Sequence, residues 1–280
     1  MEKAIQIAYD SFFEMKCELA KKAGFKSISV NFYGMLGKSE SDWSKAVDNI
    51  GRILDKTGIE CIQIHPYYYD LLLSSEIEKP ECEYAIEQAI IAGAHLGSKW
   101  AAIHPRTSIS SGYRTTVSLE DNKKMLERYL ECAIKHGTGI AAENLLIFAG
   151  IVPIVPFYSS NYEDLAVLVD SVNDAKCKIC WDFGHANLMD FNHAEAIEFL
   201  GKRIVCTHVH NNFGREDSHF PPECGNIKWN EVMPALAKTG YNGALTLETH
   251  CAYQEEDILE SFAKYNFDCL KFIEKYAKID

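Results

Sequence analysis

The sequence has no long apolar run of the kind that a membrane span or a secretion signal requires. No segment approaches about 18 uninterrupted apolar residues, the length that crosses a bilayer as a helix. The first residues, MEKAIQIAYDSF, are charged and lack an apolar stretch followed by a small-residue cleavage site. These absences predict a soluble, cytoplasmic protein without a membrane partner.

A basic stripe is also missing. The 280 residues carry a formal net charge of −12, and no run of lysines or arginines stands out. Proteins that bind duplex nucleic acid usually present such a stripe, because it releases counterions from the phosphate backbone. The charge balance therefore disfavours nucleic acid as a partner and favours a small, polar substrate.

The cysteines form no disulfide or zinc pattern. Ten of them are spread across a chain that is too long to need disulfide staples, which favours reduced thiols. The one C-x-x-C pair, Cys177 and Cys180, lies in the strand-like run KCKICWDF, where residues three apart point to opposite faces. Buried core thiols are therefore expected, rather than a redox or zinc pair.

Linker-like tracts and a dinucleotide-binding fingerprint are absent as well. No Pro-, Gly- or Ser-rich stretch divides the chain, and apolar residues make up 47%, enough for a sizeable core. No G-x-G-x-x-G follows the first strand candidate, where a fold that binds a dinucleotide carries it. The prediction is a single domain over residues 1–280 with no organic cofactor.

Short β-rich runs alternate with amphipathic helical segments along the whole chain. Apolar residues recur at helical spacing in segments such as 122–137, 162–172 and 257–277. Regular alternation predicts parallel strands, and eight such units predict closure into an α/β fold, the (β/α)8 TIM barrel. An open doubly wound sheet is the alternative. The predicted strands are 4–10, 26–32, 61–66, 99–105, 139–144, 177–183, 203–210 and 243–250.

The connections after the strands are longer than those before them. Helix-to-strand links such as 56–60 are short, and active sites of this fold lie on the loops after the strands. The length asymmetry therefore places function at the C-terminal face of the barrel. The long loops are 66–83, 105–119, 144–161 and 210–228.

Ionisable residues stand at the ends of the predicted strands. Because side chains alternate along a strand, the residue two positions earlier shares the same face. For the strand ends Glu143, Asp182, His208 and Glu248, the residues two positions earlier are Ala141, Cys180, Cys206 and Thr246. All four are small enough for a barrel interior. The same phase holds for His104 after Ala102 and for His65 after Gln63. The strand-end residues that we expect to point inward are Glu143, Asp182, His208 or His210, and Glu248.

Three carboxylates that converge on one barrel mouth repel one another unless a cation balances them. Two Glu, one Asp and one His form an oxygen-rich set with one imidazole, which suits one Mn²⁺, Mg²⁺ or Co²⁺ ion. Zinc remains an alternative through its tolerance of mixed ligands. The plainer alternative is that each residue is an isolated polar group at a strand end, hydrogen-bonded or solvated.

Five segments in this order resemble the xylose-isomerase-like TIM-barrel superfamily. That group holds sugar and sugar-phosphate isomerases and epimerases, inosose dehydratases and apurinic nucleases of the endonuclease IV type. The resemblance implies a metal site of Glu143, Asp182, His208 and Glu248, in agreement with the strand phases. The segments are AAENL (141–145), CWDFGHANL (180–188), THVHNNFG (207–214), DSHFPPECGNIKW (217–229) and LTLETH (245–250).

The resemblance also implies roles around the metal. Glu143 and Glu248 would form the acid/base pair that moves a proton through an enediolate. Asp217 and His219 match positions that hold additional metal in the nucleases, as His65 and His104 also do. Arg106 and Arg215 are predicted on loops at the mouth, where an arginine holds a hydroxyl, carboxylate or phosphate or is simply solvated. The residues expected to contact substrate are His185, His210, His104, His65 and Arg215.

The leading hypothesis is a divalent-metal-dependent isomerase or epimerase of a sugar, sugar phosphate or polyol. An endonuclease IV-like zinc phosphodiesterase acting on apurinic DNA, an inosose dehydratase-type lyase and a non-catalytic carbohydrate-binding barrel are the alternatives. The sequence does not name the sugar, and a homo-oligomer remains open because proteins of this group often associate.

Overall fold

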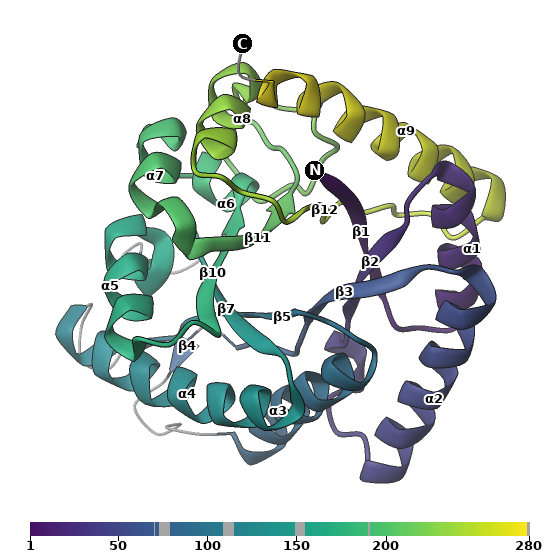
Figure 1. Cartoon of the computed structure of the whole chain (residues 1–280), viewed down its shortest axis with the longest axis horizontal. Coiled ribbons are helices and arrows are strands. Elements are labelled where there is room, and N and C mark those ends of the chain that lie inside the picture. Colours follow the sequence, from purple (N-terminus) through teal and green to yellow (C-terminus); the bar gives the residue numbers. More distant parts are fainter. Residues whose placement is uncertain (70, 73–78, 109–114, 149–154, 190, 279–280) are drawn as a thin grey trace.

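The computed structural model describes residues 1–69, 71–72, 79–108, 115–148, 155–189 and 191–278. Eight parallel strands form a closed barrel with helices around it (Figure 1). This confirms the predicted TIM barrel and excludes the open sheet. In pairing order, the strands are β1 (Glu2–Ala8), β12 (Ala244–Leu247), β11 (Ile204–Val209), β10 (Cys177–Asp182), β7 (Gly139–Glu143), β5 (Trp100–Ile103), β3 (Glu60–His65) and β2 (Ser27–Asn31).

Helices form the outer layer. Helix α5 covers the predicted span 162–172, whereas α4 starts at residue 115, before the predicted 122, because its first turns are polar and show no clear apolar period. Among the described helices, none combines the length and apolarity needed to cross a bilayer. The helices are α1 (Phe13–Ala23), α2 (Glu40–Thr57), α3 (Pro80–His95), α4 (Thr115–His136), α5 (Tyr162–Val172), α6 (Phe183–Asn187), α7 (His193–Leu200), α8 (Trp229–Lys238) and α9 (Glu256–Glu274).

Helix α2 illustrates how local sequence sets these elements. Ser39 and Asp42 form a capping box at its start, and its last turn ends at Gly58 with a positive φ of 62°. Trp43 and Ile50 belong to its buried face, which packs on the barrel. The helix is therefore bounded by its caps and held by an apolar stripe.

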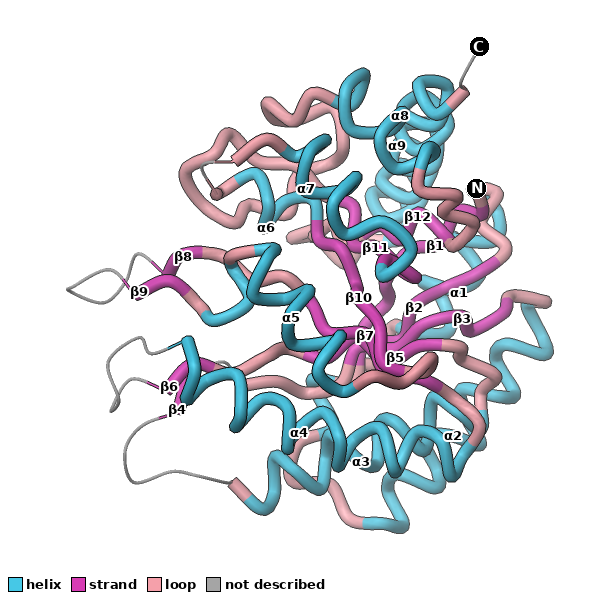
Figure 2. Tube along the Cα trace, turned by 60° about the vertical axis from the view of Figure 1, so that its left-hand side comes forward, coloured by secondary structure: helices cyan, strands magenta, loops and turns pink. Residues whose placement is uncertain are grey.

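The loops after three neighbouring strands carry small sheets of their own. β4 (Leu71–Leu72) pairs in parallel with β6 (Thr107–Ser108), and β8 (Ile147–Phe148) pairs antiparallel with β9 (Val155–Pro156). Figure 2 shows both pairs projecting from the same side of the barrel. Two-residue strands have no periodic signal, so the sequence predicts only long loops here. Within the predicted long loops, residues 73–78, 109–114 and 149–154 lie outside the described residues.

Small side chains fill the barrel interior below its C-terminal end. Ala102, Ala141, Cys180 and Cys206 form a buried cluster separate from the large core between strands and helices. Cys177 belongs to that outer core, so the two cysteines of the C-x-x-C pair face opposite sides, as expected. Burial raises the pKa of the Cys177 thiol to about 12, which keeps it neutral.

Arg106 is not a solvated arginine, so that sequence interpretation is wrong. It is 7% exposed, and its guanidinium lies 2.7 Å from Glu83 on α3 and donates to the Tyr129 hydroxyl on α4 at 2.6 Å. The ring of Tyr69 covers it at 3.8 Å. Burial raises the pKa of Glu83, but Arg106 and the hydroxyls of Tyr129 and Tyr69 together outweigh burial and lower it. Arg106 therefore ties the β5 loop to two helices.

We expect Arg106→Met to lower the free energy of unfolding by about 3 to 5 kcal/mol, because it leaves the buried Glu83 carboxylate without its main partner. Denaturant unfolding measures the loss. Arg128→Met is the matched control: Arg128 contacts Glu83 at 3.5 Å but is 41% exposed, so we expect a loss below about 1 kcal/mol. Equal losses in the two variants would contradict this structural role of Arg106.

Candidate metal centre at the barrel mouth

Four predicted ligands meet at the C-terminal end of the barrel. Glu143 ends β7, Asp182 ends β10, His208 lies in β11, and Glu248 follows β12. Nδ1 of His208 lies 2.9 Å from Glu143 Oε1, 3.0 Å from Glu248 Oε2 and 3.8 Å from Asp182 Oδ2. Ligands about 2.1 Å from a shared metal ion lie about 3 to 4 Å apart, so the spacing of these donors fits one ion.

The charges in this group are compensated through His208. Glu143, Asp182 and His208 are fully buried, and Glu248 is 8% exposed. Burial opposes a charged imidazole, but Glu143 and Glu248 outweigh it and raise the pKa of His208 well above its usual value. Without metal, the imidazolium thus takes the place that a cation would otherwise fill among the carboxylates.

Two glutamine side chains support this group from inside the barrel. The Gln63 amide lies 2.7 Å from Nε2 of His208, and Gln6 donates to Glu248 Oε1 at 2.7 Å. An amide presents either its oxygen or its N–H group, so Gln63 supports the charged and the neutral ring alike. The sequence predicted Gln63 only as an inward residue of its strand, and the role of Gln6 was not predicted.

Asn144 fixes the position of Asp182. Its side chain accepts from the Asp182 backbone N–H at 2.7 Å and donates to the Asp182 carbonyl at 2.8 Å. The pair joins the end of β7 to the end of β10. In the sequence, Asn144 is marked only by its position directly after Glu143. The sequence does not show that its side chain binds the backbone of Asp182 on another strand.

A second group of donors shares Glu143. Nε2 of His104 and Nε2 of His65 lie 3.4 Å and 3.6 Å from Glu143 Oε2. Nδ1 of His65 is 2.9 Å from the Pro66 carbonyl, which turns Nε2 toward Glu143. Burial lowers the pKa of His65, which favours the neutral, ligating form of the ring. The Tyr68 ring stacks on His104 with centroids 4.2 Å apart.

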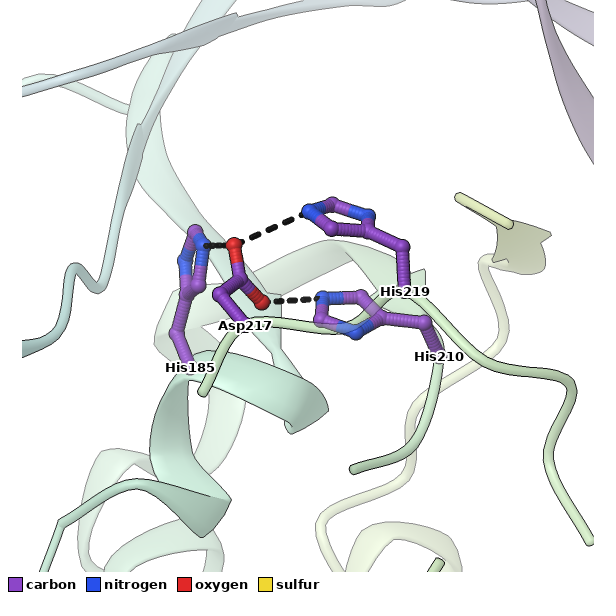
Figure 3. Close-up of side chains that lie close together, drawn as sticks. All are labelled: His185, His210, Asp217 and His219. Atoms are coloured by element: carbon purple, nitrogen blue, oxygen red, sulfur yellow. Dashed lines mark hydrogen bonds and ion pairs between the residues drawn. The ribbon is translucent and has the colours of Figure 1, made fainter. Parts of the chain in front are cut away.

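A third group lies beside Asp182 and is shown in Figure 3. His185 comes from α6, His210 directly follows β11, and Asp217 and His219 come from the loop beyond. Asp217 Oδ2 lies 2.9 Å from His219 Nε2 and 3.4 Å from His185 Nε2, while Oδ1 lies 3.8 Å from His210 Nε2. His210 also approaches Asp182 Oδ1 at 3.0 Å, which joins the third group to the first.

Backbone carbonyls orient the histidines of the third group. Nδ1 of His185 donates to the Asn144 carbonyl at 2.9 Å, and Nδ1 of His219 donates to the Glu248 carbonyl at 2.7 Å. Metal-ligating histidines commonly bind in this way, with one ring nitrogen on a carbonyl and the other toward the ion. The donor chemistry of the three groups therefore fits divalent metal.

Close packing and backbone strain keep this arrangement in place. A Cβ atom on Gly184 would lie 1.8 Å from the His210 ring, so the ring occupies space that only glycine leaves free. His219 has a positive φ of 46°, a conformation that non-glycine residues rarely adopt and that concentrates at functional sites. Its ring nitrogen Nε2 lies 2.9 Å from Asp217 Oδ2.

The remaining predicted contact, Arg215, lies exposed on the loop after β11. It is outside the three donor groups. To contact a substrate at the centre, the Arg215 side chain would have to extend from this loop, because it does not contact the donor groups.

The chain belongs to the family described as xylose isomerase-like TIM barrel, whose model matches residues 17–266. This match confirms the resemblance carried by the motifs. An uncharacterized protein of Methanocaldococcus jannaschii is 29% identical over 231 residues, which cover 78% of this chain and 75% of that protein.

Solved structures share the fold at low identity. A D-psicose 3-epimerase from Clostridium cellulolyticum H10, solved with D-tagatose, matches with a TM-score of 0.75 and 16% identity over 98% of this chain and 99% of the other. A protein named IOLI, solved with a zinc atom, matches with a TM-score of 0.74 and 16% identity over 99% and 98%. At these identities the likeness establishes the fold alone.

In the metal-free protein, we expect His219 to titrate at about pH 9, because Asp217 and Glu248 outweigh the effect of burial on its pKa. Histidine NMR titration measures this. Buried His193 is the internal comparison, with a pKa that burial lowers to about 4. Asp217→Asn should bring the pKa of His219 down. Titration of His219 near pH 6.5 in the unsubstituted protein would contradict the pairing.

Proposed function

We propose that the chain is a divalent-metal-dependent isomerase or epimerase of a small sugar, sugar phosphate or polyol. One observation carries the proposal: the carboxylates of Glu143 and Glu248, from separate strands, lie 2.9 Å and 3.0 Å from the same nitrogen of His208. Two carboxylates that converge on one point are what proton removal and return at a substrate carbon require. The epimerase named among the structures of this fold agrees with that chemistry.

Glu143, Asp182, His208 and Glu248 would hold the ion. When bound, a divalent ion polarises a substrate carbonyl and makes the adjacent C–H group more acidic. The oxygen-rich set with one imidazole suits Mn²⁺, Mg²⁺ or Co²⁺, and zinc tolerates it. Substrate oxygens would complete the coordination.

The side chains of the protein then carry out the proton transfer. One of the two glutamates removes the proton from the carbon beside the carbonyl, and the other returns a proton to the opposite face or to the neighbouring carbon. Gln6 holds Glu248 by its hydrogen bond, and burial of both carboxylates limits exchange with water. His185 and His210 would donate to substrate hydroxyls, and the exposed Arg215 would reach a distal hydroxyl or phosphate.

A second candidate is a zinc-dependent phosphodiesterase of the endonuclease IV type. It is favoured by the two further donor groups, which contribute five imidazoles and Asp217 beside the four-residue set. Imidazole-rich groups suit zinc, and neighbouring ions clamp the oxygens of a phosphate ester. The net charge of −12 weighs against long duplex DNA as the substrate.

Metal content separates the two candidates. After purification with Mn²⁺ and Zn²⁺ supplied, we expect about one tightly held ion per chain, because the four-residue group unites three buried carboxylates. Elemental analysis by mass spectrometry measures it. About three zinc ions per chain, with hydrolysis of a phosphodiester, would favour the second candidate instead. His208→Ala should abolish retention of the single ion.

We expect Glu143→Gln and Glu248→Gln each to lower turnover by about 100- to 10,000-fold, because each removes one partner of the proton transfer. A panel of free and phosphorylated ketoses and inososes identifies the substrate, and deuterium uptake from solvent at the reacting carbon measures proton removal. Metal content is measured for each variant, so that loss of the ion is distinguished from loss of the base. Exposed Glu231→Gln on α8 is the control. Full turnover in both site variants would exclude the mechanism.

A further inference from the structure

A cavity of about 240 Å³ lies beside the candidate metal centre. It is bounded by the last residues of β1, by α1, by α9 and by residues 248–254 after β12. None of the roles argued above uses it. Its position at the C-terminal end of the barrel is where ligands of this fold bind.

The cavity begins at the candidate acid/base residues. Glu248 and Gln6 both line it, and Glu248 Oε2 is 3.0 Å from His208 Nδ1 while Oε1 accepts from Gln6. A molecule bound at the metal centre therefore has this cavity next to it.

The cavity has both polar and apolar walls. Leu19 and Ala20 of α1 and Leu259, Phe262 and Ala263 of α9 supply the apolar wall. Gln6 lines the cavity and holds the Glu248 carboxylate by a hydrogen bond from its amide at 2.7 Å.

The volume fits a ring-sized apolar group. An apolar cavity of about 150 Å³ accommodates benzene. The larger volume here has room for a phenyl group or a branched alkyl group together with the atom that attaches it. A free sugar would leave the apolar wall uncovered.

We propose that this cavity is a substrate subsite for a compact apolar substituent, aryl or branched alkyl. The preferred substrate is then a sugar or polyol derivative that carries such a group. The proposal rests on the proposed function for the chemistry at Glu143 and Glu248. Binding in the cavity is testable without turnover.

Two probes that differ only in the substituent test the subsite: phenyl β-D-glucopyranoside and methyl β-D-glucopyranoside. We expect the phenyl compound to bind the metal-loaded protein about 10- to 100-fold more tightly in calorimetry, from burial of the ring. It should also slow alkylation of Cys251, which lines the cavity, relative to the exposed Cys224 in the same chain. Equal affinity for the two probes would overturn the subsite.

Substitutions on α9 locate the binding. Ala263→Phe fills the cavity and should abolish the preference for phenyl, whereas Ser261→Phe, exposed on the same helix, should keep it. Leu259→Ala enlarges the cavity and should extend the preference to a naphthyl glucoside, which gives a test even if Ala263→Phe does not fold. An unchanged phenyl preference in Ala263→Phe, or no preference for the naphthyl glucoside in Leu259→Ala, would refute the location. A phenyl preference that Ala263→Phe removes would uphold the subsite, whether or not any sugar is turned over. Absence of turnover on every sugar tested would count against the proposed reaction alone.

Discussion

Burial of several carboxylates at one end of an apolar barrel is the constraint on which the rest of the site depends. Glu143 and Asp182 are fully buried, and Glu248 nearly so. An uncompensated buried carboxylate is strongly destabilising, so the surrounding residues must supply positive charge or hydrogen-bond donors. His208 does this for Glu143, the backbone N–H of His185 for Asp182, and Gln6 for Glu248. The polar network is thus a condition for folding as well as a site for chemistry.

The barrel makes this concentration of charge feasible by its layering. Small apolar side chains fill the interior, Gln63 and Thr246 form an amide and hydroxyl contact above them, and the ionisable groups follow toward the mouth. Gln63 contacts both the apolar layer, through Cys180, and His208. The group of Glu143, Asp182, His208 and Glu248 therefore rests on packed side chains of the strands, which favours the precise spacing that metal ligation and proton transfer need.

The part of the site that the sequence predicts is the part governed by local periodicity. The two-residue alternation along each strand assigns Glu143, Asp182, His208 and Glu248 to one interior because it needs no knowledge of distant partners. Arg106 shows the limit: its neighbour His104 follows the strand phase, but its own position depends on Glu83, which another loop and helix bring near. His219 is a second example, since its left-handed backbone arises from the fold of a loop. The hydrogen bond between Gln6 and Glu248 is a third example, because the two residues are far apart in the sequence.

Charge balance links the number of ions to the class of substrate. Four carboxylates, those of Glu143, Asp182, Asp217 and Glu248, meet three imidazoles whose pKa is raised, those of His185, His208 and His219. In the proposed isomerase, one divalent ion that displaces the proton of His208 adds one positive charge to the centre, a small change that suits a neutral sugar. Ions in all three groups that displace three protons would add three positive charges, which an anionic phosphate ester would balance. The same donors thus favour isomerase or hydrolase chemistry according to how many groups are filled, so the affinity of the second and third groups for metal is the physical quantity that selects between them.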